Sequence, residues 1–332
     1  MENPNFRFNS IVQEMNDCFG INDIFAIYYD KKDNNELYLI SPSKNFSIKV
    51  TRLKDNKLIR TLEGHTGKIT LIRHCFNSIT QKDYLISSGK HSEVKVWDLS
   101  DNFNLLFSLK INYSKNTNIY SSLLFFSENN GNYLITSSNE NQVEDFTKLY
   151  DFNTQELKAN LELTNQVEIF YMLTWNNGKY DFLIESGVGI ILMHNLETKE
   201  LFKVFNPSYK SSQNSMCIIK NPEDNKIDLL CVATIRGSID FWDLDTFTFK
   251  FSVRHKSSYF YDLINWFDRY VIVAEKFSSL IIIIDLAQRR VISTIKNKNN
   301  SYVISLKMIT HPLFGQSLLS SDLDGKIILW TH

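Results

Sequence analysis

The side chains that most often perform catalysis or bind metals are thinly spread along this chain. Its seven histidines lack the His-x-x-x-His spacing that places two imidazoles on one zinc ion, and none has an acidic companion at ligand spacing. Serine and aspartate are plentiful, but no Gly-x-Ser-x-Gly turn presents a nucleophile. No glycine-rich phosphate-binding loop follows a strand-like run. We therefore expect no enzyme activity, no bound metal and no cofactor.

The four cysteines give no sign of a zinc site or of a disulfide framework. Cys18, Cys75, Cys217 and Cys231 lie far apart and form no Cys-x-x-Cys motif, so we expect reduced and mostly buried thiols. The first residues lack a secretory signal, and no apolar run approaches the roughly 20 residues that span a bilayer. These features predict an intracellular, cytoplasmic protein with no membrane span, and they leave nuclear, cytoskeletal and ciliary locations open.

The charge balance argues against an electrostatic partner. Lysine and arginine number 36 against 37 aspartates and glutamates, a net charge of -1, so no overall field attracts nucleic acid or an anionic membrane. We expect no direct nucleic-acid binding. Hydrophobic residues make up 43% of the chain, which is ample material for a large core.

The sequence that surrounds these side chains contains a recurring pattern. A short run rich in apolar residues occurs seven times, and we take one residue of each copy as its anchor. The anchors are Thr51, Trp97, Tyr150, His194, Trp242, Ile284 and Trp330. They are 42 to 53 residues apart, a period typical of propellers and solenoids. Seven linked repeats leave no room for a second domain, so we expect residues 1–332 to form one domain.

Each repeat contains a predicted β-hairpin that ends in its anchor. Twelve residues before six of the anchors stands an apolar residue in a strand-like run: Leu39, Leu85, Phe182, Leu230, Ile272 and Leu318. In the third repeat Leu134 precedes Tyr150 by 16 residues, so we expect a longer, acidic turn within 139–148. Further β-rich runs flank each hairpin, giving four strands per repeat. Because most runs are apolar on both faces, each small sheet must be covered on both sides by its neighbours.

The recurring pattern resembles the WD-repeat β-propeller family over nearly the whole chain. The clearest copy runs from Gly64-His65 to Trp97-Asp98. The resemblance implies an all-β, seven-bladed propeller with four antiparallel strands per blade. It also implies a hydrogen-bonded set of His, Ser or Thr, Trp and Asp in each good repeat.

No repeat carries that full set at the expected spacing. His65, Ser87 and Trp97 match in the second repeat, but His91 occupies the acidic position. In the last repeat Ser320, Asp324 and Trp330 match, but the histidine is missing. The resemblance therefore predicts the fold and leaves the subfamily open.

The family closes its ring with an N-terminal segment that supplies the outermost strand of the last blade. Here the chain stops two residues after Trp330, so the last repeat lacks a fourth strand. Residues 5–12 precede the first repeat with strand-like alternation. We predict that these two segments pair, which removes an exposed sheet edge.

The hairpin tips provide the hypothesis for function. The residue seven positions before the anchor lies at the tip, and six of these residues are Lys44, Lys90, Gly187, Ile235, Phe277 and Leu323. Three consecutive repeats thus carry apolar residues where polar turn residues are usual. We predict that these apolar tips form a patch on one rim of the ring. The other members of the patch are Arg236, beside Ile235, and the aromatic residues of the loops that lead into repeats six and seven: Tyr259, Phe260 and Tyr302.

We therefore expect a non-catalytic scaffold or adaptor that binds protein partners through this rim, as a subunit of a larger assembly. Lys44, Lys68 and Lys90 would flank the patch across the ring. A purely structural alternative stays open, in which the degenerate turns tuck these side chains under neighbouring loops.

A lipid-binding alternative rests on the run from Val253 to Lys256. Phosphoinositide-binding propellers of the autophagy type, which are related to this family, carry Phe-Arg-Arg-Gly at the corresponding place. Arg254 matches, but His255 replaces the second arginine. Because one bidentate phosphate clamp is lost, we do not expect lipid headgroup binding.

Overall fold

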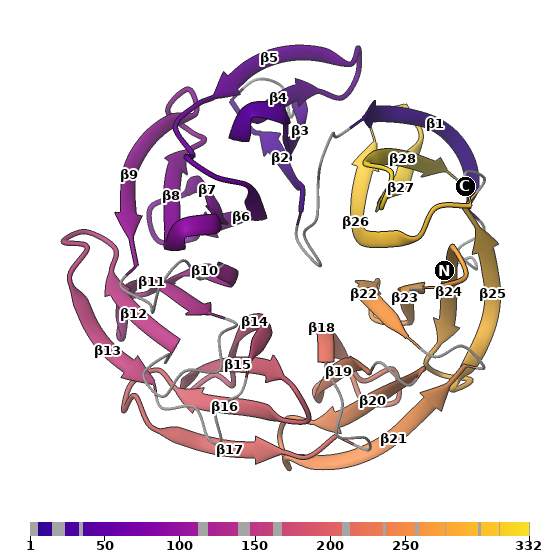
Figure 1. Ribbon diagram of the computed structural model, residues 1–332. Helices are drawn as coiled ribbons and strands as arrows, with labels where there is room; N and C mark the ends of the chain where they lie inside the picture. Colours follow the sequence, from indigo (N-terminus) through magenta and orange to yellow (C-terminus); the bar gives the residue numbers. More distant parts are fainter. Residues whose placement is uncertain are drawn as a thin grey trace.

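The computed structural model is a closed ring of seven antiparallel sheets of four strands each, arranged as blades around an axis (Figure 1). This is the seven-bladed all-β propeller that the repeat pattern predicted. In the part of the chain that is described, the helical elements are two 3-10 turns, η1 (Lys44–Phe46) and η2 (Lys90–Ser92), and no helix is long and apolar enough to cross a membrane. The structure describes residues 6–14, 24–32, 36–111, 119–138, 147–161, 168–207, 213–234, 237–255, 259–275, 277–297, 300–311 and 313–331.

Each of the first six blades is built from four strands that are consecutive in the chain, and its innermost strand comes first. Blade 1 contains β2 (Ala26–Asp30), β3 (Glu36–Pro42), β4 (Ile48–Arg52) and β5 (Lys57–Leu62). Blade 2 contains β6 (Ile69–Asn77), β7 (Lys82–Gly89), β8 (Glu93–Asp98) and β9 (Asn104–Lys110). Blade 3 contains β10 (Ile119–Ser127), β11 (Gly131–Ser138), β12 (Thr147–Asp151) and β13 (Leu157–Leu161). Blade 4 contains β14 (Ile169–Asn176), β15 (Asp181–Gly187), β16 (Ile191–Asn195) and β17 (Leu201–Phe205).

The last blade differs from the others because its strands come from both ends of the chain. Blade 5 contains β18 (Gln213–Lys220), β19 (Asp228–Thr234), β20 (Ser238–Asp243) and β21 (Thr248–Arg254). Blade 6 contains β22 (Phe260–Trp266), β23 (Tyr270–Glu275), β24 (Leu280–Asp285) and β25 (Arg290–Lys296). Blade 7 contains β26 (Val303–His311), β27 (Gly315–Asp322) and β28 (Lys326–Thr331), and β1 (Arg7–Glu14) is its outermost strand.

Blade 2 illustrates why these sequences form strands that are buried on both faces. Trp97 and Leu85 pack against blade 1, whereas Val96 and Ile86 on the opposite face pack against blade 3. Successive residues of a strand point to opposite faces, so both faces need apolar side chains. Each blade is therefore stabilised mainly by burial against its two neighbours.

The hairpin register confirms the predicted pairing in most repeats and corrects it in two. The apolar residue twelve positions before the anchor is its cross-strand partner in repeats one, two, five and seven, and Leu134 pairs with Tyr150 in the third. In the fourth repeat His194 pairs with Leu183 instead of Phe182. In the sixth, Ile284 pairs with Val271 instead of Ile272. Compared with the offset of twelve residues, the hairpin of the fourth repeat is one residue shorter and that of the sixth is one residue longer, so the partner of the anchor moves by one position.

Ring closure follows the prediction. Strand β1 pairs antiparallel with β28, with Phe8 opposite Trp330, and the register shifts twice along the pair. The expected segment 5–12 becomes 7–14 in the structure, and residue 5 lies outside the described residues. Just before β1, the ring of Phe6 packs edge-on against Trp266 of blade 6 at 4.7 Å. The N-terminal segment therefore contacts two blades.

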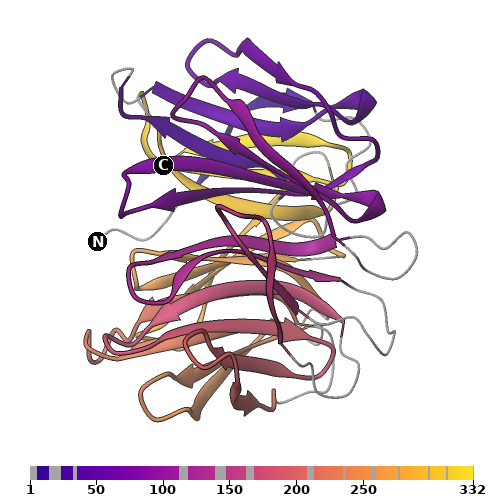
Figure 2. The same ribbon diagram turned by 90° about the vertical axis from the view of Figure 1, so that its left-hand side faces the viewer.

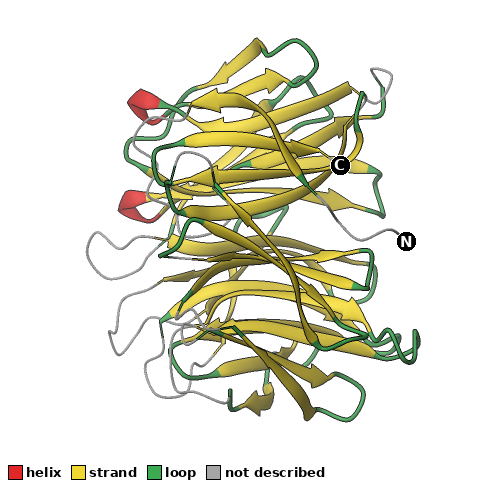
Figure 3. Ribbon diagram, turned by 90° about the vertical axis from the view of Figure 1, so that its right-hand side faces the viewer, coloured by secondary structure: helices red, strands yellow, loops and turns green. Residues whose placement is uncertain are grey.

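Two ends of the ring can be distinguished. In each blade the turn between the second and third strands lies at the same end as the connection to the next blade, and we call this end the hairpin face. Figures 2 and 3 show the ring from the side, with η1 and η2 at the hairpin face in Figure 3. The turns between the first and second strands lie at the opposite face. The predicted long turn of the third repeat, within 139–146, lies outside the described residues.

Candidate functional site

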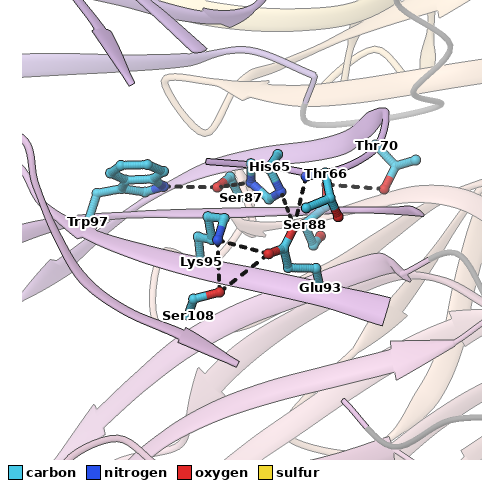
Figure 4. A network of polar contacts seen from close by, with 9 residues as sticks. All are labelled: His65, Thr66, Thr70, Ser87, Ser88, Glu93, Lys95, Trp97 and Ser108. Atoms are coloured by element: carbon cyan, nitrogen blue, oxygen red, sulfur yellow. Dashed lines mark hydrogen bonds and ion pairs between the residues drawn. The ribbon is translucent and has the colours of Figure 1, made fainter. Parts of the chain in front are cut away.

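A buried chain of polar contacts joins blade 2 to the connection that precedes it (Figure 4). The Trp97 Nε1–H donates to Ser87 Oγ at 2.9 Å, and Ser87 Oγ lies 2.7 Å from His65 Nε2. His65 Nδ1 lies 3.3 Å from Glu93, which also receives an ion pair from Lys95 at 2.8 Å. The sequence assigned the acidic position to His91, and this was wrong. Glu93, two residues later, supplies the carboxylate because His91 lies in η2, where the chain turns with a φ of 67°.

The electrostatics of this network keep the imidazole neutral. Burial lowers the pKa of His65 to about 4, against the opposing attraction of Glu93. Burial alone would raise the pKa of Glu93, but hydrogen bonds from Lys95 and from the Thr66 N–H outweigh it and lower the pKa. A neutral imidazole beside an ionised carboxylate donates from Nδ1 to Glu93 and accepts the Ser87 hydroxyl at Nε2.

The order Ser87, His65, Glu93 has the composition of a hydrolytic triad, so its accessibility decides its role. Ser87 is completely buried, and its oxygen already accepts the indole N–H of Trp97. A substrate carbonyl has no path to that oxygen. The network instead fixes the connection at His65 against the hairpin of blade 2.

Blade 7 contains a shortened version of the same arrangement. The Trp330 Nε1–H donates to Ser320 Oγ at 2.8 Å. Asn297 takes the place of the histidine and donates to Asp322 at 3.1 Å. The sequence placed the acid at Asp324, and the structure corrects this to Asp322, which is fully buried whereas Asp324 is exposed.

A third polar contact lies between blades 3 and 4, where His194 replaces the tryptophan. His194 and Glu185 are both buried, and their Nδ1 and Oε2 atoms are 3.1 Å apart. The Thr147 hydroxyl of blade 3 donates to the other oxygen of Glu185. The sequence gave His194 a structural role, and this contact is consistent with it. Glu185 was missed because nothing in a strand-like run marks a buried acid.

Four of the predicted rim residues meet at the hairpin face of blades 6 and 7. The ring of Phe277 lies perpendicular to Tyr259 at 4.9 Å and to Tyr302 at 6.0 Å. The Leu323 N–H donates to the Tyr302 carbonyl at 2.9 Å, which brings the blade 7 turn beside the same ring. Phe277 is 54% exposed and Leu323 is 39% exposed. We call Tyr259, Phe277, Tyr302 and Leu323 the rim patch.

Phe260 does not belong to the rim patch, contrary to the prediction. It is 1% exposed and packs in the core between blades 5 and 6, because β22 begins at this residue and turns its side chain inward. Ile235 and Arg236 lie outside the described residues, as does the side chain of Lys44. Lys68 and Lys90 adjoin each other in blade 2, where the Lys90 N–H donates to the Lys68 carbonyl. Lys90 is exposed and Lys68 is half-buried.

The candidate lipid motif lies at the end of the outer strand of blade 5. Arg254 is the last residue of β21 and is exposed, and the His255 N–H is bonded to the Gly237 carbonyl. Within the described ranges, no group of three or more His, Cys, Asp or Glu side chains is placed to hold a metal ion. Cys217 and Cys231 face each other across β18 and β19 as free thiols, and Cys18 lies outside the described residues.

Sequence reasoning missed a second exposed apolar feature on the opposite face. Leu313 and Phe314, in the turn between β26 and β27, are 75% and 45% exposed. Buried His311 stacks on Phe314 at 4.8 Å and accepts the Leu313 N–H at 3.1 Å, which holds this turn in place. The sequence signal was present as adjacent apolar residues in a turn, but the repeat pattern directed attention to the hairpin tips.

The comparisons with known proteins agree with this architecture. The family described as WD domain, G-beta repeat matches residues 56–98, the stretch that contains His65, Ser87 and Trp97. No curated protein matches the chain at a significant level. The matched stretch ends at the last residue of β8, so it contains the whole buried polar network of blade 2 from His65 to Trp97.

Proposed function

We propose, from the premise that this chain is a WD-repeat β-propeller, that it is a non-catalytic scaffold or adaptor in a larger intracellular assembly, and that the rim patch binds its protein partner. Propellers of this family commonly serve as protein-interaction scaffolds. The observation that carries the proposal is the aromatic cluster on the hairpin face, where turns normally expose polar residues.

The composition of the rim patch supports a role in binding. Tyrosine and phenylalanine are both enriched at protein interfaces, and tyrosine is also enriched among the residues that dominate the binding energy. The side chains come from four separate segments, so the patch is a property of the folded ring. The exposed Phe277 ring, with two perpendicular aromatic neighbours, offers a partner an apolar and aromatic contact surface.

Hydrogen bonds between described residues beside the rim patch also support the proposal. The Ser279 hydroxyl donates to the Asn300 carbonyl at 2.7 Å, which ties the blade 6 turn to the following connection. The Asn297 N–H in turn donates to the Ser279 carbonyl at 2.8 Å. Because Ser279, Asn297 and Asn300 are already held together, a partner that binds beside them loses less conformational entropy.

The test is affinity purification of tagged protein carrying Phe277→Ser and Leu323→Ser, with identification of stoichiometric partners. We expect the partner to be lost, since removing a central aromatic contact costs about 2 kcal/mol or more, roughly 30-fold in Kd. Phe46→Ser is the matched control, because Phe46 is similarly exposed on η1 at the same face of blade 1. If the double variant melts normally and keeps every partner, the rim patch is not the binding surface.

A further inference from the structure

A small cavity lies directly beside the rim patch. It has a volume of about 230 Å³ and is lined by Asn300, Ser301, Tyr302, Leu323 and Asp324. Two of these residues, Tyr302 and Leu323, also belong to the rim patch. The cavity, which we call the connection pocket, therefore continues the apolar surface into a polar recess.

The connection pocket is built on a frame of hydrogen bonds. The fully buried Asn297 side chain donates to the Ser301 carbonyl at 2.9 Å and to Asp322 at 3.1 Å. On the other wall, the Asp324 N–H donates to Ser301 Oγ at 3.2 Å. Both walls are thus fixed relative to each other before any partner arrives, which favours a specific contact over a loose one.

The charge of the connection pocket is negative. Asp324 is the one charged residue among those that line it, and within the described residues its carboxylate has no ion-pair partner. Asp322 lies near Asp324 but does not line the pocket. Burial and the charge of Asp324 raise the pKa of Asp322, against hydrogen bonds from Lys326 and Asn297 and the charge of Lys326, which lower it. The exposed carboxylate of Asp324 therefore gives the connection pocket a negative charge that attracts a cation.

We propose that the connection pocket receives a lysine or arginine side chain of the bound protein, from an extended segment whose neighbouring aromatic or large aliphatic residue covers Phe277. This inference rests on the proposed function and adds the chemistry of the partner to it. An apolar contact next to a cation pocket makes binding specific for a pair of residues in the partner. The Phe277 ring supplies affinity, and Asp324 repels segments that carry an acid in place of the lysine or arginine.

The experiment is selection from a displayed library of random linear peptides against the intact propeller. We expect enriched peptides to carry lysine or arginine at a constant spacing from an aromatic or large aliphatic residue. A synthetic copy of the best peptide should bind Asp324→Asn about fivefold more weakly. Selection against Asp324→Lys should enrich aspartate or glutamate at the same position. Asp245→Lys is the matched control, because Asp245 is an exposed acid in the turn after β20, at the opposite face.

The outcomes separate this inference from the proposed function. Peptides that lose binding with Phe277→Ser, yet show no basic residue and bind Asp324→Asn as tightly as the wild type, overturn the pocket assignment and leave the rim patch intact. An absence of enriched peptides overturns the pocket assignment and leaves the rim patch to the affinity purification; peptides that are indifferent to Phe277→Ser count against both. An equal loss with Asp324→Lys and Asp245→Lys also counts against the pocket, since it reveals a general charge effect.

Discussion

Phe6 gives the most direct test of how the ring is closed. Its side chain is 4% exposed, lies against Trp266 and shares the core between blades 6 and 7 with Trp330. Phe6→Ala removes the ring but leaves the backbone pairing of β1 and β28 possible. The variant therefore separates the side-chain anchor from the strand itself.

The expected loss follows from burial. Truncating a buried phenylalanine to alanine costs about 3–5 kcal/mol, which includes the cavity left behind and the lost contact with the Trp266 ring. The unfolding entropy near the melting temperature is about 2.1 cal/mol/K per residue. For the chain of 332 residues this amounts to roughly 0.7 kcal/mol/K, so Phe6→Ala should lower the Tm by about 4–7 °C.

The assay is thermal unfolding followed by circular dichroism, with Phe46→Ala as the control. Phe46 is exposed on η1, and its truncation should change the Tm by less than about 1 °C. Deleting residues 1–12, which removes most of β1, should lower the Tm further than Phe6→Ala. The reasoning is refuted if Phe6→Ala melts within about 1 °C of the wild type.

Three further predictions concern charge. Lowering the pH from 7 to 5 should reduce the free energy of unfolding of the wild type by about 2 kcal/mol through His65. The reason is that the unfolded imidazole takes up a proton near pH 6.5, whereas the buried one, with a pKa of about 4, does not. In urea unfolding, the free energy of unfolding of His65→Gln should fall by about 2 kcal/mol less over the same pH range. Burial raises the pKa of Glu275 to about 7, so Glu275 destabilises the fold increasingly as the pH rises from 4.5 to 7. Glu275→Gln should therefore raise the Tm more at pH 8 than at pH 4.5, and equal shifts at the two pH values would contradict this. In liposome flotation, the protein should not float with phosphatidylinositol 3-phosphate, and flotation that disappears in Arg254→Ala would restore the lipid-binding alternative.

The faces of the blades were predictable from the sequence, whereas the turn lengths were not. The seven anchors all lie on the third strand of their blade, because a period of two fixes which residues share a face. The partner of an anchor depends on the turn between the two strands, and no residue in the fourth or sixth repeat reveals that its turn differs by one. Phe182 and Ile272 therefore lie one position away from the residues that pair with His194 and Ile284.

The candidate site shows the same division. Phe277 and Leu323 were found because apolar residues at hairpin tips are unusual. Phe260 was misplaced because the start of β22 falls one residue after Tyr259, and a single step along a strand reverses the direction of the side chain. Glu93 and Asp322 were missed because the acid was located by counting from the tryptophan, whereas the local turn decides which carboxyl reaches inward.

The pairing of β1 with β28 also constrains how the protein is made. Strand β1 leaves the ribosome about 300 residues before β28, so blade 7 stays incomplete until β28 has been synthesised. Bringing together ends separated by about 300 residues costs roughly 5 kcal/mol of chain entropy by the usual logarithmic scaling. A circular permutant with its new ends within another blade would make blade 7 contiguous in sequence. The other blade would then stay incomplete until synthesis ends.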